Sequence, residues 1–330
     1  MSIYLGSSDL QALFSRRIVT ARECIDAVAE AFKEHGRSSV EAMPRRILWA
    51  SGKSKQPRDR ALKLSAAYMQ DSKIMGASIY STHFQPGSVN MWVNVFSGDS
   101  GEMLGVINSK HLSIWKTAST ATVAARAMAR PDTRRMALIG TGSYALEQLT
   151  FMVEVFPLDE VRCFSRDPAN LASFCARASA RAKIPVHAVH SARAAVEQAD
   201  VVTTITTSPV PVVKGAWLRE GAHCNVLGQH ASTAREVDTA AVLQSRVVVD
   251  SLDQAMEEKG EILIPIQEGA LAAGHVAGEL GAVLTGRLSG RCTAREVTMF
   301  CSGGTAFEYM SLSRLLIERA RETGIGQRLN

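Results

Sequence analysis

The sequence lacks the features that would place the chain in a membrane or on nucleic acid. No window reaches the roughly 18 apolar residues that a membrane span needs, and the N-terminus has no charged segment followed by an apolar one. The chain also lacks a large excess of charge of one sign. Its 37 Lys and Arg against 32 Asp and Glu leave a net charge of +5, and the basic residues form no continuous run. We therefore expect a cytoplasmic protein with no membrane and no nucleic acid among its partners.

Cysteine pairs at short spacing are also missing. The six cysteines occur singly, with no C-x-x-C pair and no Cys/His cluster at the spacing of metal ligands. We expect free thiols in a reducing compartment and no bound metal. What is present is the composition of a globular protein, with 46% hydrophobic and 21% charged residues, over a length of 330 residues that favours two domains.

The first part of the chain mixes helical and extended patterns. Apolar residues at helical spacing predict two amphipathic helices within residues 7–33, with Thr20 as the cap of the second. Short β-rich runs between residues 76 and 108, separated by turn residues, predict an antiparallel sheet of hairpins. An Ala-rich helix then runs from about Ile114 to Ala129.

From residue 136 onward, strands and helices alternate with short connections. Helical segments separate the strands expected at 136–139, 160–164, 186–189 and 201–206, and two more strands are expected near 225–228 and 247–250. This order is typical of a parallel, doubly wound sheet of about six strands. We therefore predict an α/β protein with a Rossmann-type domain.

The stretch from Met136 to Ala145 ends an apolar strand in a G-x-G-x-x-A turn and opens a helix. Gly140 supplies the tight turn, Gly142 lets the backbone approach a pyrophosphate, and Ala145 permits close packing of the helix on the strand. The diphosphate would lie on N–H groups at the positive end of the helix dipole. The predicted cofactor loop consists of Gly140, Thr141, Gly142, Ser143, Tyr144 and Ala145. The alternative is a Rossmann-type domain that binds no ligand.

The next strand predicts which dinucleotide binds. Where NAD enzymes carry an acidic residue for the ribose hydroxyls, this sequence has Ser165-Arg166-Asp167. Arg166 can form planar bidentate bonds to a 2′-phosphate, and Ser165 leaves room that a carboxylate would fill. We expect NADPH, with NADH as the alternative if Asp167 serves the ribose or only pairs with Arg166. Thr206 and Ser208, at the end of a later strand, are expected beside the nicotinamide, although threonine is also a good strand former.

Taken in order, the motifs resemble the ornithine cyclodeaminase/mu-crystallin family over nearly the whole chain. The collinear pieces include Met43-Pro44-Arg45-Arg46, 101–105, Lys116-Thr117-Ala118, the glycine turn, 200–206, Gly228 with 235–238, 278–291 and 302–306. The resemblance implies a homodimer that acts on a small amino-acid or imino-acid substrate. It also implies two domains, with residues 118–302 binding the dinucleotide and residues 1–117 with 303–330 forming an α+β domain for substrate binding and dimerisation.

The resemblance further implies particular substrate-binding residues. An arginine that binds the substrate carboxylate is supplied by Arg46 or Arg45, and Lys116 stands in place of a second arginine. Because an ammonium group replaces a planar guanidinium, Lys116 keeps the positive charge but cannot bind a carboxylate through two parallel hydrogen bonds. The lysine that binds substrate in the family aligns with Ser78, and Lys73 is the neighbouring candidate to compensate for it.

Two histidines complete the expected site. The family's cyclodeaminases carry an acidic residue just after the glycine that corresponds to Gly228, whereas here the residue is His230. An imidazole titrates near working pH and could donate a proton to an imine nitrogen or a carbonyl oxygen, so cyclodeamination is disfavoured. A single loop histidine is also often a plain surface residue. His83 is expected to line the substrate pocket, and Glu308 to begin the last helix, where the helix dipole stabilises an acid.

These residues predict an NAD(P)H-dependent reductase or dehydrogenase of a small imino or keto acid. In this hypothesis Arg46 and Lys116 neutralise the substrate carboxylate and His230 transfers the proton. Two alternatives stay open: an ornithine cyclodeaminase-like lyase or cyclic hydroxyamino-acid dehydratase, and a non-catalytic protein of mu-crystallin type that binds NADPH and a small ligand. The sequence leaves the substrate and the direction of the reaction open.

Overall fold

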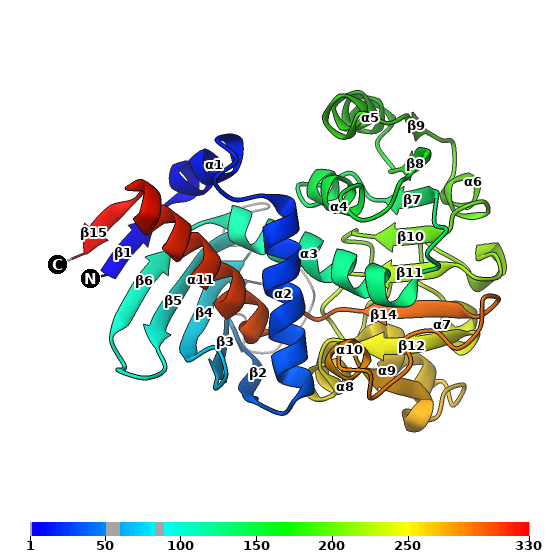
Figure 1. The fold of residues 1–330 in the computed structure, drawn as a ribbon. Coiled ribbons are helices and arrows are strands. Elements are labelled where there is room, and N and C mark those ends of the chain that lie inside the picture. The colour runs from blue at the N-terminus through cyan, green and yellow to red at the C-terminus, as the bar shows by residue number, and fades with distance from the viewer. Residues whose placement is uncertain (1, 51–59, 83–88, 330) are drawn as a thin grey trace. The chain divides into compact units, whose positions relative to one another are not determined.

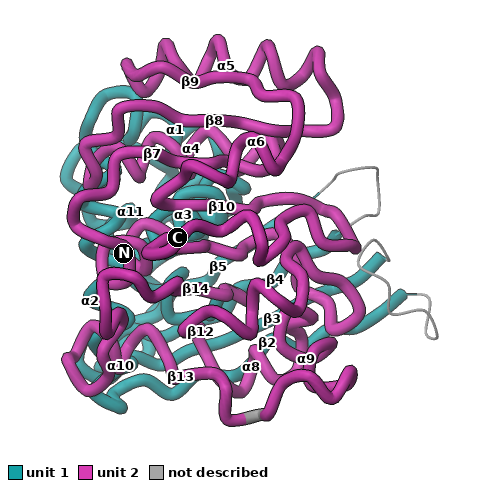
Figure 2. Tube along the Cα trace, turned by 90° about the vertical axis from the view of Figure 1, so that its right-hand side faces the viewer, with its two compact units in different colours: residues 1–120, 304–330 teal, residues 121–303 magenta. Residues whose placement is uncertain are grey.

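The chain divides into two compact units, which we describe one at a time. The computed structural model describes residues 2–50, 60–82 and 89–329. Unit 1 comprises Met1–Thr120 with Gly304–Asn330, and unit 2 comprises Ala121–Gly303 (Figure 2). From the sequence we place these divisions after residue 117 and before residue 303. None of the helices in the described ranges is long and apolar enough to cross a membrane.

Unit 1 is built on a seven-stranded sheet in the order β15-β1-β6-β5-β4-β3-β2. Strands β2 to β6 are antiparallel neighbours, whereas β1 is parallel to β6. Figure 1 shows α11 lying across the sheet beside α2. The elements are β1 (Ser2–Leu5), α1 (Ser7–Ser15), α2 (Ala21–Gly36), β2 (Val40–Trp49), β3 (Ala61–Met69), β4 (Ile74–Thr82), β5 (Val89–Ser97), β6 (Met103–Ile107), α11 (Ala306–Thr323) and β15 (Gln327–Leu329). The helix α3 (Lys110–Met128) begins in unit 1 and ends in unit 2.

The capping of α2 confirms the sequence prediction. The Thr20 hydroxyl accepts a hydrogen bond from the Glu23 N–H at 3.2 Å, and the Glu23 carboxylate accepts one from the Thr20 N–H at 2.9 Å. Strands β2 and β3 were not predicted. β2 contains Pro44 beside an irregularity in its pairing and β3 is rich in alanine, so both sequences have weak intrinsic strand preference and depend on pairing with their neighbours.

Unit 2 is a parallel sheet in the order β13-β12-β14-β11-β10-β7-β8-β9. In β7, Met136 and Leu138 belong to one apolar cluster, whereas Ala137 and Ile139 belong to another. Since successive strand residues point to opposite faces, helices cover both faces of the sheet. The predicted doubly wound α/β fold is therefore confirmed.

The sheet of unit 2 has eight strands, so the expectation of about six was too low. The two missed strands are β13 (Val276–Glu279) and β14 (Val297–Cys301), and β14 enters between β11 and β12 from far along the chain. The other elements are β7 (Arg135–Ile139), α4 (Ala145–Met152), β8 (Glu160–Phe164), α5 (Pro168–Ala182), β9 (Val186–Ala188), α6 (Ala192–Val196), β10 (Val201–Thr204), β11 (His223–Val226), α7 (Thr239–Leu243), β12 (Ser245–Val249), α8 (Leu252–Glu258), α9 (Gly260–Gln267) and α10 (Leu280–Leu284).

Candidate active site

The glycine loop follows β7 at the carboxyl edge of the unit 2 sheet. Gly140 has a φ of +105°, and a Cβ there would lie 2.6 Å from the carbonyl oxygen of Ile205, so the turn itself demands glycine. Gly142 is different, because no described atom lies within 4 Å of the place its Cβ would take. The backbone at Gly142 is therefore open to a ligand, as a pyrophosphate requires.

Two backbone N–H groups of this loop are available to bind an anion. Among the residues that the structure describes, no group accepts a hydrogen bond from the N–H of Gly142 or Ser143, and both residues are exposed. Tyr144 follows as the N-cap of α4, so these donors lie at the positive end of the helix dipole. The Asn170 amide fixes the loop by donating to the Thr141 hydroxyl at 2.7 Å. The loop thus fits a diphosphate.

The residues after β8 fit a ribose phosphate. Asp167 is the N-cap of α5, and its carboxylate accepts hydrogen bonds from the N–H groups of Ala169 at 3.0 Å and Asn170 at 3.1 Å. Arg166 is exposed, and within the described residues its guanidinium has no hydrogen-bond or ion-pair partner. Capping therefore engages Oδ1 of Asp167, and no ion pair joins Asp167 to Arg166 among the described residues. Ser165 lies half-buried beside Arg166.

The loops after β10 and β11 are tied to each other. The carboxylate of Glu236 accepts hydrogen bonds from the Thr206 N–H and the Gly228 N–H, both at 2.6 Å. A Cβ on Gly228 would lie 2.2 Å from the Thr206 carbonyl oxygen, so only glycine permits this approach. Ser208 donates its N–H to the Thr206 hydroxyl at 3.1 Å. The structure therefore brings Thr206, Ser208 and Gly228 together at one edge, with His230 half-buried two residues after Gly228.

Two cations of unit 1 converge on Gly304. The Arg45 guanidinium donates to the Gly304 carbonyl oxygen at 3.0 Å. A Cβ on Gly304 would lie 2.5 Å from Nζ of Lys116 and 3.6 Å from Nη2 of Arg45, and the φ of +77° likewise favours glycine. Both side chains are buried, with exposed fractions of 9% for Arg45 and 3% for Lys116. We call Arg45 and Lys116 the cation pair, which suits the recognition of a carboxylate.

Glu308 is the counter-ion of Lys116. The Lys116 ammonium lies 3.4 Å from the Glu308 carboxylate, with both side chains almost fully buried. Glu308 also accepts hydrogen bonds from Thr305, as part of the cap of α11, and from the Thr120 hydroxyl. The Tyr309 ring lies 5.1 Å from Nζ of Lys116, and burial raises the pKa of its hydroxyl. Glu308 therefore both caps its helix and holds Lys116 in place.

The chain is similar to known proteins along nearly its whole length. The chain matches the family model of the ornithine cyclodeaminase/mu-crystallin family over residues 11–324. The chain belongs to this family. The solved structure of Thermococcus litoralis Delta(1)-pyrroline-2-carboxylate reductase in complex with NADH and L-proline is 30% identical, covers 99% of this chain and 100% of its own, and has a TM-score of 0.92.

Two further curated relatives have related activities. A Delta(1)-pyrroline-2-carboxylate reductase of Bacillus cereus is 29% identical over 243 residues, which are 73% of this chain and 74% of that protein. An alanine dehydrogenase of Archaeoglobus fulgidus is 27% identical over 94% of each chain. The family predicted from the sequence motifs is thus confirmed.

The two candidates for the family's substrate-binding lysine, Ser78 and Lys73, have different surroundings. Ser78 is buried in β4, with its hydroxyl 2.8 Å from that of Ser65 on β3. Lys73 lies in the turn before β4, and its ammonium is 3.2 Å from the carboxylate of Asp99, with both side chains more than half exposed. The structure therefore does not bring Lys73 to Ser78, because Ser78 is the fifth residue of the strand that Lys73 precedes.

Arg46 is also separate from the cation pair. It is exposed and pairs with Leu64 in the sheet, whereas its neighbour Arg45 is buried, since successive strand residues face opposite ways. Of the two candidate arginines, Arg45 is therefore the one that lies beside Gly304 with Lys116. His83 lies outside the described residues. Sequence reasoning missed Gly304, although the paired glycines of the family's last motif were a signal that the backbone comes close to another group there.

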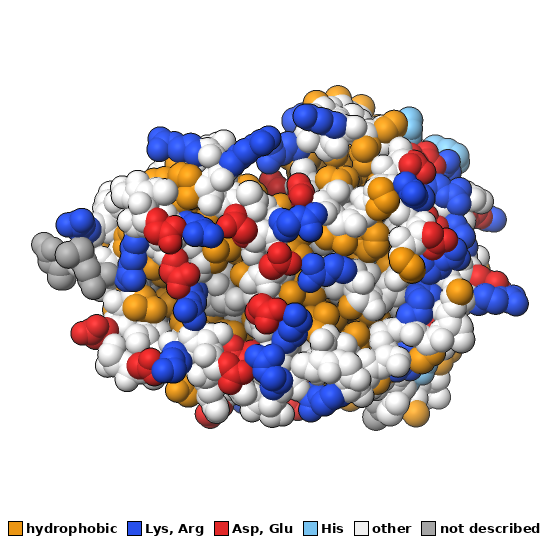
Figure 3. Space-filling view, in the orientation of Figure 1, with side chains coloured by type: hydrophobic (Ala, Val, Ile, Leu, Met, Phe, Trp, Pro, Cys, Tyr) orange, Lys and Arg blue, Asp and Glu red, His pale blue; other side chains and the backbone are white. Residues whose placement is uncertain are grey.

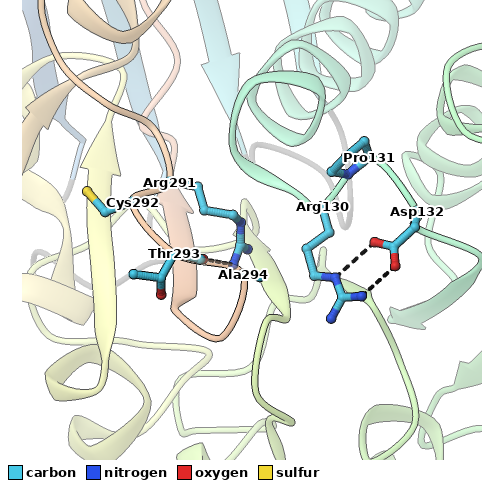
Figure 4. Close-up of a pocket in the computed structure, with 7 residues that line it drawn as sticks. All are labelled: Arg130, Pro131, Asp132, Arg291, Cys292, Thr293 and Ala294. Carbon is cyan, nitrogen blue, oxygen red and sulfur yellow. Dashed lines mark hydrogen bonds and ion pairs between the residues drawn. The ribbon is translucent and has the colours of Figure 1, made fainter.

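A pocket of about 460 Å³ lies near the amino ends of strands β7 and β14 of unit 2, away from the glycine loop (Figure 4). Arg130 in its wall is paired with Asp132, as Figure 4 shows. Arg291 donates to the main-chain oxygens of Met128 and Ala222. Both guanidinium groups are engaged within the protein, and no residue predicted for the site lines this pocket, so we do not assign a ligand to it.

Proposed function

We propose that this protein is an NAD(P)H-dependent reductase of a small cyclic imino acid that carries a 2-carboxylate, such as Delta(1)-pyrroline-2-carboxylate. The relatives bear out the prediction of a nicotinamide-dependent oxidoreductase acting on a carbon–nitrogen bond. The observation that carries the substrate proposal is the convergence of Arg45 and Lys116 on Gly304, because these two buried cations outnumber the Glu308 carboxylate that pairs with Lys116 and so favour a further carboxylate.

Each residue has a defined part in this reaction. When bound, the nicotinamide cofactor supplies the hydride that the imine carbon accepts. The cation pair binds and orients the substrate carboxylate. His230 donates a proton to the imine nitrogen, so that hydride and proton together reduce the C=N bond. Arg166 binds the 2′-phosphate of NADPH, which we propose as the preferred cofactor, with NADH as the alternative.

The test is turnover of purified protein with NADPH or NADH and a panel of cyclic imines. The key pair is Delta(1)-pyrroline-2-carboxylate and the same ring without its carboxylate. We expect loss of the nicotinamide absorbance with the first compound and little with the second. Absence of any absorbance change over the panel would count against the proposal. Release of ammonia from ornithine without net change of the cofactor would point to the lyase, and a raised Tm with NADPH but no turnover would point to a binding protein.

We also propose that the protein is a homodimer joined through one face of the unit 1 sheet. Leu48, Leu62, Ile79 and Trp92 are all exposed, with exposed fractions of 60%, 38%, 38% and 40%. They lie on the same face, since Leu48 pairs with Leu62, Leu62 pairs with Ser81, and Ile79, two residues before Ser81, pairs with Trp92. Ser78, next to Ile79, is buried on the other face, which α11 covers. We call these four residues the outer sheet face, and a second copy of the chain would bury it.

The proposed location is the cytoplasm. All six cysteines are free thiols, and Cys292 among them is exposed. An exposed free thiol is most readily retained in a reducing compartment. Detection of the native protein in the cytosolic fraction would support this location, and a disulfide in the purified native protein would contradict it.

A further inference from the structure

Several ionisable side chains lie fully buried near the carboxyl ends of the unit 2 strands. Lys259, Glu236 and Glu261 each have an exposed fraction of 0%, and we call them the buried triad. The Lys259 ammonium lies 3.5 Å from the Glu261 carboxylate. It donates hydrogen bonds to the carbonyl oxygens of Gln229 at 2.7 Å and Ser302 at 3.1 Å. One ammonium therefore holds the chain just after β11 and just after β14.

Glu236 holds the neighbouring pair of strand ends. Besides the N–H groups of Thr206 and Gly228, its carboxylate accepts a hydrogen bond from the Thr204 hydroxyl at 2.9 Å. Its own N–H donates to the Glu261 carboxylate at 3.0 Å, which links it to Lys259. The ends of β10, β11 and β14 are thus connected through a single set of buried charges.

Burying charged groups costs free energy of desolvation, and apolar side chains of similar size often stabilise a fold equally well or better. Burial lowers the pKa of Lys259, but the surrounding acidic groups, Glu261 first among them, outweigh it and leave the pKa raised. The ammonium therefore stays charged. The side-chain hydrogen bonds of Lys259 and Glu236 to the rest of the described chain go to residues at the carboxyl ends of strands, which is where an α/β sheet binds its ligand.

Gln229 extends this connection to the next loop. Its carbonyl oxygen accepts from Lys259, and its side-chain amide donates to the Ser208 carbonyl oxygen at 2.6 Å. Gln229 is almost fully buried, and it lies between Gly228 and His230 in the chain. The backbone on the amino side of His230 is therefore fixed at two consecutive residues.

We propose that Lys259 and Glu236 are positioning residues for the nicotinamide half of the cofactor. They set the spacing of the loops at 206–208 and 228–230, and through them the place of His230. This inference rests on the proposed function, since it presupposes a nicotinamide cofactor. The glycine loop and Ser165-Arg166, which would bind the adenosine half, have no side-chain hydrogen bond to the triad among the described residues.

The experiment compares ligands that contain the nicotinamide with ligands that lack it. The double variant Lys259→Met with Glu261→Gln removes both charges, so that neither is left alone in the interior. Equilibrium titrations would give the dissociation constants of NADPH and NADH, and of ADP-ribose and its 2′-phosphorylated form. We expect the whole cofactor to bind about tenfold more weakly and the fragments to change by less than about twofold.

Two further variants keep the test decisive. Val201→Ala truncates a buried side chain at the amino end of β10, and as a control for lost stability it should affect whole cofactor and fragments alike. Thr204→Val removes one donor to Glu236 while preserving shape, and serves if the double variant does not fold; we expect a smaller loss confined to the whole cofactor. Equal weakening of both ligand types, or no weakening, would overturn the inference. A wild-type protein that binds neither ligand would refute the proposed function instead.

Discussion

Among single residues, Asp167 determines the surroundings of Arg166. The aspartate follows the arginine directly, and an ion pair between them would have left no charge for a ligand. Because the carboxylate instead caps α5 through Ala169 and Asn170, the guanidinium stays exposed at the end of β8. A cofactor preference can thus depend on a neighbour that never touches the cofactor.

We predict that Arg166→Gln weakens the use of NADPH and spares NADH. A hydrogen bond to a charged group contributes about 1.5–3 kcal/mol, which corresponds to a loss of roughly 10- to 150-fold in kcat/KM for NADPH. Initial rates with each cofactor would measure this ratio. Arg177→Gln, on the exposed side of α5 and bonded to Ser173, removes the same charge and should leave the ratio unchanged. An equal loss with both cofactors would contradict a role at the 2′-phosphate.

We predict that Lys116→Met weakens substrate binding and leaves cofactor binding unchanged. Removing the ammonium takes one of the two cations from the carboxylate, so we expect KM for the imino acid to rise about tenfold or more, with cofactor affinity unchanged. Breaking a buried pair also costs about 3–5 kcal/mol of folding stability, because the Glu308 charge remains. Titration of cofactor by fluorescence and denaturation in urea would check both effects.

The control for Lys116 is Lys33→Met in α2. Lys33 pairs with Glu30 at 2.7 Å, and the two side chains are 39% and 64% exposed, so the loss of Lys33 should change stability by no more than about 1 kcal/mol and leave KM unchanged. If Lys116→Met alters cofactor affinity as much as KM, the assignment of Lys116 to the substrate carboxylate is wrong.

At the scale of helices and strands, local pattern decides what the sequence could predict. β8 was expected at residues 160–164 and forms at Glu160–Phe164, because a short β-rich run bounded by turns is a local signal. The glycine loop is equally local, and its residues were found together. The cation pair is different, since Arg45 and Lys116 meet at Gly304 only after three distant segments fold. No local spacing of residues in the sequence predicts that these three segments come into contact.

β11 contains a buried histidine that we expect to make unit 2 sensitive to acid. His223 is fully buried, and its ring lies 2.9 Å from the Thr298 hydroxyl and 3.0 Å from the side-chain oxygen of Asn225. Burial lowers the pKa of His223 from 6.5 to about 3. The folded protein therefore keeps the ring neutral at a pH where the unfolded chain protonates it.

The consequence is a loss of stability as the pH falls below 6.5, continuing down to about pH 3. Between pH 7.5 and pH 5 we expect this one group to lower the free energy of unfolding by about 2 kcal/mol. Urea denaturation of the wild type and of His223→Gln at the two pH values isolates the effect, because all other groups titrate in both proteins. The variant should lose about 2 kcal/mol less than the wild type, and equal losses would refute the assignment.

For the whole molecule, the weak net charge matters for assembly. Lys and Arg are interspersed with Asp and Glu over the face seen in Figure 3. A net charge of +5 on 330 residues gives little repulsion between two copies. The homodimer was expected from the family resemblance alone, because the outer sheet face comes from strands β2, β3, β4 and β5, and the first two were not recognised in the sequence.

The dimer proposal makes a prediction about mass in solution. A charge on the outer sheet face would have to be buried without a partner in the dimer, so Trp92→Lys combined with Ile79→Lys should give a monomer of 35.6 kDa where the wild type has twice that mass. Leu243→Lys is the matched control, since Leu243 is 45% exposed in unit 2 and lies outside this face. Sedimentation velocity would distinguish the species. A wild-type monomer, or a double variant that stays dimeric, would exclude this face as the interface. Cofactor titration of the monomeric variant would then show whether the glycine loop, Arg166 and the buried triad suffice within one chain, as their bonds inside unit 2 predict.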